Sequence, residues 1–228
     1  MHKMQILAIC ALSLVANAAQ SAIIHLEGDT VDFYYDDAQP GMAAYGDLTV
    51  VGDSIFATPT GFLAEASGIN GTDTYSSLGT ITVVLKSGYT FDYVAVAQQG
   101  DYQVVGAGAA VSVVSDLTVE DSNNASTSET SMMTVSGLGL NDGLLHEWSS
   151  SGAFDLSTAT WDGVLSIDLS LDSLLAASTT TSAEYALIQN KLTGGGLITI
   201  ETVVVPVPTS FVLFISGLLG LLGVSRRR

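Results

Sequence analysis

The stretch Leu48-Thr49-Val50-Val51-Gly52-Asp53-Ser54-Ile55-Phe56-Ala57 places two short apolar runs on either side of a Gly-Asp pair. Valine, isoleucine and phenylalanine favour strands, and a two-residue turn that contains glycine joins strands in a tight hairpin. The stretch therefore predicts one strand over residues 47–51 and a second over 54–57, paired with each other.

Alternating apolar and polar residues continue in both directions from this hairpin, with Gly, Asp, Asn and Ser between the runs. This period-two pattern is typical of antiparallel strands. Further strands are expected over 23–27, 31–35, 62–67, 80–85, 90–98, 102–105, 110–120, 131–136, 144–149, 163–170, 184–190 and 197–204. The polar segment 121–129 predicts a loop, and Gly100-Asp101, Ser149–Gly152 and Gly194–Gly196 predict breaks or turns. Residues 171–178 are compatible with a helical turn or with a continued strand.

About a dozen short strands with regular turn signals, and no long helical period, predict an all-β protein. The expected architecture is a single antiparallel β-sandwich of the jelly-roll type. No internal repeat or domain boundary is visible, so the sandwich is expected over residues 19–204. The segments 1–18 and 205–228 differ from it in composition.

The first 18 residues have the pattern of a signal peptide. Lys3 precedes an apolar run from Ile6 to Ala16, and Ala16 and Ala18 are the small residues expected before a cleavage site. We therefore expect export through the secretion translocon, and signal peptidase cleavage after Ala18. The next choices for the cleavage site are Ser21 and Ala22.

The C-terminal segment has three parts: Val205-Pro206-Val207-Pro208, an apolar run from Phe211 to Val224, and Arg226-Arg227-Arg228. As a helix the apolar run is only about 21 Å long, against a hydrocarbon core of about 30 Å, and the flanks from Thr209 to Ser225 lengthen it. The run predicts a short transmembrane helix. The arginines are expected to stay on the cytoplasmic side, which leaves the body outside the inner membrane. The small residues that such helices use for close contacts are Gly217, Gly220 and Gly223.

This order of a Pro-x-Pro motif, a glycine-spaced apolar span and an arginine cluster resembles the PEP-CTERM sorting signal of Gram-negative bacteria. The resemblance implies recognition by exosortase, a membrane-embedded cysteine transpeptidase. It further implies cleavage near Pro206–Pro208, and release or transfer of the body to the cell surface or exopolysaccharide. Val207 stands where the name-giving motif has glutamate. The segment therefore resembles the Val-Pro-x-Pro variant, and the exosortase subtype stays open.

Parts of the body also resemble PEP-CTERM proteins of unknown activity. The matching stretches are 32–37, 56–62, 99–102 and 186–191. These matches are loose, and they imply no molecular activity.

The body is strongly acidic and has no cysteine. The whole chain carries a formal charge of −17, but Lys3 and the three arginines lie in the terminal segments. The body therefore opposes 23 acidic residues with Lys86 and Lys191 alone, which gives −21. This charge repels phosphate, so the composition argues against binding to nucleic acid or to anionic membranes. Because Cys10 lies in the signal peptide, the mature fold depends on packing without disulfides.

Few residues could carry catalysis, and a non-catalytic protein is expected. His25 and His146 are too few for a zinc site, and no Gly-x-Ser-x-Gly motif is present. The stretch His146-Glu147-Trp148 predicts an ordinary strand-end cluster. Glycoside hydrolysis needs two carboxylates in a cleft. The candidate acids on strands or at strand ends share no motif: Glu65, Glu120, Glu147 and Glu201.

A structural calcium ion is the one cofactor that the composition suggests. Carboxylate oxygens suit calcium, and a group of aspartates lies near the start of the body. No EF-hand spacing is present, and chance clustering accounts for such a group in a chain this acidic. The candidates are Asp29, Asp32, Asp36 and Asp37, and the loop aspartates are Asp101, Asp121, Asp142 and Asp155.

These features predict an exported, non-catalytic protein of the cell surface or extracellular matrix, processed by exosortase and associated with exopolysaccharide. Two alternatives stay open. An aromatic-lined concave face with two nearby carboxylates would favour a carbohydrate-binding module or a polysaccharide-active enzyme. A C-terminal segment that is never cleaved would instead make the chain a permanently tail-anchored protein that faces the periplasm.

Overall fold

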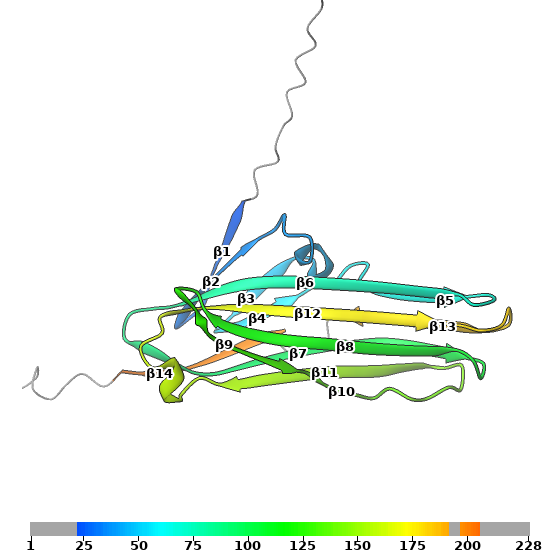
Figure 1. Ribbon diagram of the computed structural model, residues 1–228. Helices are drawn as coiled ribbons and strands as arrows, with labels where there is room; N and C mark the ends of the chain where they lie inside the picture. Colours follow the sequence, from blue (N-terminus) through cyan, green and yellow to red (C-terminus); the bar gives the residue numbers. More distant parts are fainter. Residues whose placement is uncertain (1–21, 192–196, 206–228) are drawn as a thin grey trace, which may run out of the picture.

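A computed structural model describes residues 22–191 and 197–205. Within these residues the chain forms fourteen strands and two short 3-10 turns. Figure 1 shows how they are arranged. The elements are β1 (Ile23–Glu27), β2 (Val31–Asp36), η1 (Met42–Tyr45), β3 (Leu48–Val51), β4 (Ser54–Ala57), β5 (Leu63–Ser67), β6 (Thr72–Leu85), β7 (Tyr89–Val105), β8 (Ala110–Asp121), β9 (Asn124–Met132), β10 (Thr134–Ser136), β11 (Leu145–Asp155), η2 (Ala159–Trp161), β12 (Ser166–Ser178), β13 (Tyr185–Lys191) and β14 (Ile198–Val204).

The strands form two antiparallel sheets. The first sheet has the order β1-β2-β6-β12-β8-β9, and its long strands β6, β12 and β8 lie side by side in Figure 1. The second sheet has the order β10-β11-β7-β14-β4-β3. Along one edge β7 pairs with β11, and along its other edge it pairs first with β14 and then with β13, which in turn pairs with β5. The expected all-β, sandwich-like fold is confirmed.

The core lies between the sheets because each long strand alternates buried and exposed side chains. In β12, Ile167, Leu169, Leu171 and Leu175 are buried, whereas Asp172 between them is exposed. This alternation runs to the end of the strand, so residues 171–178 continue the strand and form no helical turn.

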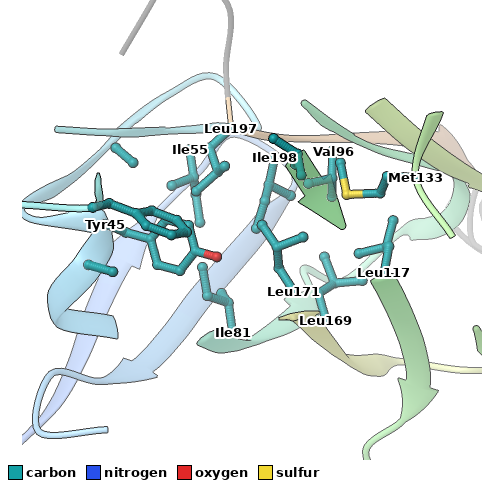
Figure 2. Close-up of a cluster of buried hydrophobic side chains, with 14 of the residues drawn as sticks. Tyr45, Ile55, Ile81, Val96, Leu117, Met133, Leu169, Leu171, Leu197 and Ile198 are labelled. Atoms are coloured by element: carbon teal, nitrogen blue, oxygen red, sulfur yellow. The ribbon is translucent and has the colours of Figure 1, made fainter. Parts of the chain in front are cut away.

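Side chains from both sheets meet in the cluster of Figure 2. Ile81 and Leu171 come from the first sheet, and Val96 and Ile198 from the second. Tyr45, from η1, lies to one side of these residues in Figure 2 and points its hydroxyl group toward them. Burial of this ring raises the pKa of Tyr45 to about 12.

Glycines inside strands were misread as breaks. Residues 89–105 form one strand, β7, and β11 runs through the expected turn at 149–152. Gly100 is needed for close packing, because a Cβ there would lie 2.7 Å from the Trp148 indole nitrogen. Gly152 faces Met133, and a Cβ added at position 152 would lie 3.0 Å from Met133 Cγ. Glycine in a strand often marks such a close approach and not a turn.

Two polar segments also differ from expectation. The expected loop 121–129 mostly forms β9, which pairs with β8 at the edge of the first sheet. The strand expected over 80–85 begins at Thr72. Both segments are rich in Ser and Thr and poor in large apolar residues, so they show little of the apolar alternation that reveals a strand. They are strands because a neighbouring strand pairs with their backbone.

The expected signal peptide and the C-terminal sorting segment, from Pro206 onward, lie outside the described residues. So do the glycines expected to form a turn at 194–196. Among the helices in the described part of the chain, none has the length and apolar character needed to cross a membrane.

Candidate functional site

The C-terminal end of β14 lies at the end of the sandwich where β7 begins. Val204 pairs with Tyr89, the first residue of β7. The amide of Val205 then donates to the main-chain oxygen of Gly88, in the β6–β7 turn, at 2.9 Å. Residue 206, the first proline of the expected sorting motif, follows immediately. The folded body therefore extends to the edge of the motif.

A shallow hollow of about 350 Å³, largely open to solvent, lies beside this end of β14 on the outer face of the second sheet. Tyr93 on β7 is its centre, because Asp155 of β11 and Glu201 of β14 pair directly with Tyr93 from opposite sides. Directly paired residues point to the same face, and two strand spacings place the backbones of Asp155 and Glu201 about 10 Å apart. Asp92 and Ser157 complete the lining.

A β-bulge brings a further carboxylate to this hollow. Glu201 pairs with Tyr93 and Thr202 pairs with Phe91, so Asp92 is an extra residue in β7. Phe91 and Val94 are both buried, and the two residues between them both line the hollow. Bulges re-aim side chains in this way, often near functional sites. The break in period two between Phe91 and Val94 is a sequence signal that could have revealed the bulge.

A second hollow, of about 370 Å³, adjoins the first and shares Ser157 with it. η2, the short coil beside β14 in Figure 1, forms part of its wall through Trp161. Trp161 is only 3% exposed, and its indole nitrogen donates to Glu129 Oε1 at 3.1 Å. Tyr93, at 37% exposed, is therefore the aromatic ring that a ligand in this region could reach.

Asp155 is held in its ionised form. Its Oδ1 accepts hydrogen bonds from the hydroxyl of Ser157 at 2.6 Å and from the amide of Ser157 at 2.9 Å. The hydroxyl bond, followed by the amide bond, lowers the pKa of Asp155. The general acid of a glycosidase needs the opposite shift. Asp155 therefore suits hydrogen bonding to a ligand better than proton donation.

The four carboxylates considered for glycoside hydrolysis lie on four different strands. Glu65 is on β5, Glu120 on β8, Glu147 on β11 and Glu201 on β14. Glu201 lines the hollow around Tyr93, and Glu147 lines a separate hollow of about 170 Å³ beside Trp148. The acids that share a hollow with Glu201 are Asp92 and Asp155, which come together only through strand pairing.

The expected calcium residues are spread over β2 and the adjoining turns. Across the described ranges 22–191 and 197–205, no group of three or more His, Cys, Asp or Glu side chains is arranged to hold a metal ion. Asp32 Oδ1 instead lies 3.3 Å from His25 Nε2 and 3.7 Å from Lys86 Nζ. Asp36 caps its own turn by accepting the Ala38 amide at 2.9 Å. The candidates considered were Asp29, Asp32, Asp36 and Asp37, and we propose no metal site there.

His146 belongs to a local cluster near the start of β11. Its Nε2 lies 2.7 Å from Asp142 Oδ1, and this contact is the main reason that the pKa of Asp142 is lowered. Its ring is tilted against Tyr102, whereas Glu147 is exposed and Trp148 is buried. This arrangement is the ordinary strand-end cluster that the sequence predicted.

Sequence reasoning missed Glu184, a carboxylate that joins two turns. It is 8% exposed, and it accepts hydrogen bonds from the amides of Gly108, Thr180 and Thr181 at 2.7–2.9 Å. These bonds, led by that of Thr180, lower the pKa of Glu184 to about 2. Gly108 and Glu184 are 76 positions apart in the sequence, so no local pattern reveals the contact.

Comparison of the chain with protein-family models, curated proteins and solved structures finds no match.

Proposed function

We propose that this protein is an exported, non-catalytic component of the cell surface or extracellular matrix of a Gram-negative bacterium. In this proposal the translocon and signal peptidase export the chain, and its C-terminal segment holds it briefly in the inner membrane. An exosortase then cleaves near Pro206–Pro208 and passes the body to the surface or to exopolysaccharide. The observation that carries the proposal is the sequence Val205-Pro206-Val207-Pro208, followed by the apolar run and Arg226-Arg227-Arg228.

The body is compatible with this role. Its two antiparallel sheets form a core without any cysteine in the expected mature chain, so the fold needs no oxidant outside the cytoplasm. We also propose the finer jelly-roll arrangement. It is supported by β12, which lies between β6 and β8 although long stretches of chain separate the three strands.

The test is the intact mass of the protein from its own host, measured separately in the membrane and extracellular fractions. We expect an extracellular form that ends near Pro206–Pro208, and any added mass identifies the group joined to it. A form that runs to Arg228 and occurs only in membranes contradicts the proposal. The protein is then a permanently tail-anchored protein.

The hollow around Tyr93 favours a second candidate function, the binding of a saccharide by the same body. A partly exposed aromatic ring, flanked by Asp92, Asp155 and Glu201, offers apolar contact together with acceptors for hydroxyl groups. Because the pKa of Asp155 is lowered, this arrangement favours binding over hydrolysis. Retention on immobilised exopolysaccharide from the host, compared with a neutral glucan, tests this candidate.

A further inference from the structure

β14 consists of two parts that differ in how firmly the core holds them. Up to the bulge at Glu201/Thr202, its inward residues Ile198 and Ile200 are each 3% exposed. Beyond the bulge, Val203 is 48% and Val204 is 70% exposed. The burial of apolar side chains that anchors the strand therefore ends at Ile200.

The second part of β14 also has fewer strand partners. β4 pairs with β14 through Ile198 and Thr199, before the bulge. Among the described residues, strand pairing beyond the bulge comes from β7 alone, opposite residues 89–91. Backbone that is exposed and paired on one side opens at a lower free energy than a buried central strand. The hydroxyl of Thr202 also donates to Thr30 Oγ1 at 2.8 Å. Thr202–Val205 is thus held by β7 and by this side-chain bond, and it is the more weakly held end of an otherwise central strand.

The weakly held part of β14 lies directly before the proposed processing motif. The last sheet hydrogen bond of β14 is made by Val205, and Pro206 is the next residue. An extended chain advances about 3.5 Å per residue, so the motif starts almost against the folded body. A transpeptidase must enclose several extended residues around the bond that it cleaves. Release of Thr202–Val205 would add about 14 Å of free chain.

We propose that Thr202–Val205 is a detachable strand end that must separate from β7 before the motif can enter the processing enzyme. The inference rests on the proposed cleavage near Pro206–Pro208. The bulge at Glu201/Thr202 is the hinge, because it already interrupts the register between β14 and β7. Ile198 and Ile200 keep the rest of the strand in the core while its end is open, so the body stays folded during processing.

A disulfide across the detachable part tests the proposal in the full chain, in its own host. Thr90 and Val203 are paired beyond the bulge, and the variant T90C/V203C joins them. The matched control A95C/T199C joins a pair before the bulge on the same two strands. A third variant adds a Gly-Ser-Gly-Ser insertion between Val204 and Val205 to T90C/V203C, which restores free chain before the intact motif without breaking the disulfide.

Cleavage is followed by intact mass in membranes from the producing cells, with and without dithiothreitol. We expect oxidised T90C/V203C to be processed more than about tenfold more slowly than the wild-type chain, because the opening step is blocked. Dithiothreitol or the insertion restores the rate, and A95C/T199C is processed normally. If the wild-type chain is cleaved and oxidised T90C/V203C is cleaved at the same rate, the proposal of a detachable strand end is wrong and the sorting proposal stands. If the wild-type chain is never cleaved, both proposals are wrong.

Discussion

Trp148 on β11 lies directly against Gly100 on β7, and its indole nitrogen donates to the main-chain oxygen of Gln189 at 3.1 Å. A Cβ at position 100 would lie 1.8 Å from that oxygen and 2.7 Å from the indole nitrogen. The contact joins three neighbouring strands, β11, β7 and β13, at one point of the second sheet.

The substitution Gly100→Ala is therefore expected to destabilise the protein. The added methyl group meets backbone as well as the tryptophan, so the sheet must shift, at a cost of about 3 kcal/mol or more. Urea unfolding followed by tryptophan fluorescence measures this cost. Gly152→Ala is the matched comparison and is expected to cost less, because its Cβ would meet the flexible Met133 side chain at 3.0 Å. Equal midpoints for Gly100→Ala and the wild-type protein would contradict the close packing.

Gln98 bridges the two sheets inside the core. Its Nε2 donates to Ser173 Oγ at 2.9 Å, and its Oε1 accepts from Ser115 Oγ at 3.1 Å. Gln98→Leu leaves these buried hydroxyls without their amide partner, and we expect a loss of about 1–3 kcal/mol. The triple variant Gln98→Leu/Ser115→Ala/Ser173→Ala is expected to regain part of this loss, because neither serine hydroxyl is then left without its amide partner. A triple variant less stable than Gln98→Leu would disprove the network.

The carboxylate of Glu184 makes stability depend on pH. Its pKa is about 2 in the folded chain, against an ordinary value of 4.5, so its ionised form stabilises the fold above pH 4.5. This stabilisation is lost as the pH falls from about 4.5 toward 2. In Glu184→Gln we expect a lower urea midpoint at pH 7 and a smaller further decline in acid than in the wild-type protein. Asp168→Asn, on β12, is a control outside this contact, and parallel pH curves for Glu184→Gln and wild type would refute the assignment.

Saccharide binding at the hollow depends on Tyr93. Tyr93→Ala removes the reachable aromatic ring, and by analogy with other aromatic stacking contacts we expect a loss of about 1 kcal/mol, roughly a fivefold weaker interaction. Titration calorimetry with oligosaccharides from the host exopolysaccharide measures it. Tyr89→Ala, at the start of β7 and outside this lining, is the control. Binding that is unchanged in Tyr93→Ala excludes the hollow as the binding site.

The parts of the fold set by short-range patterns could be predicted from the sequence. The hairpin of β3 and β4 follows from the Gly52-Asp53 turn between two short apolar runs, and its second strand has the predicted bounds. β9 could not be predicted in this way, because its polar residues pair with β8 at an edge and bury little apolar surface. Gly100 was misread as a break. A glycine is needed there because Trp148, which lies far along the chain, packs against this position.

The candidate site was harder to predict than the fold. Glu201 was considered as a carboxylate on a strand and Asp155 as a loop residue, but nothing in the sequence places them on either side of Tyr93. That arrangement depends on the pairing of β7 with β11 and β14 and on the extra residue at Asp92. Strand partners distant in sequence decide the site, and a single sequence does not specify them.

The place of β12 between β6 and β8 has a consequence for the order of folding. β12 is a central strand of the first sheet, yet it begins only at Ser166, and β14 joins the second sheet later still. Neither sheet can be completed until nearly the whole body has been synthesised, and pairings between such distant segments form slowly. A nascent chain of this topology therefore cannot complete either sheet while it emerges from the ribosome. That is the condition in which a chain can be threaded through a narrow pore before it folds on the far side.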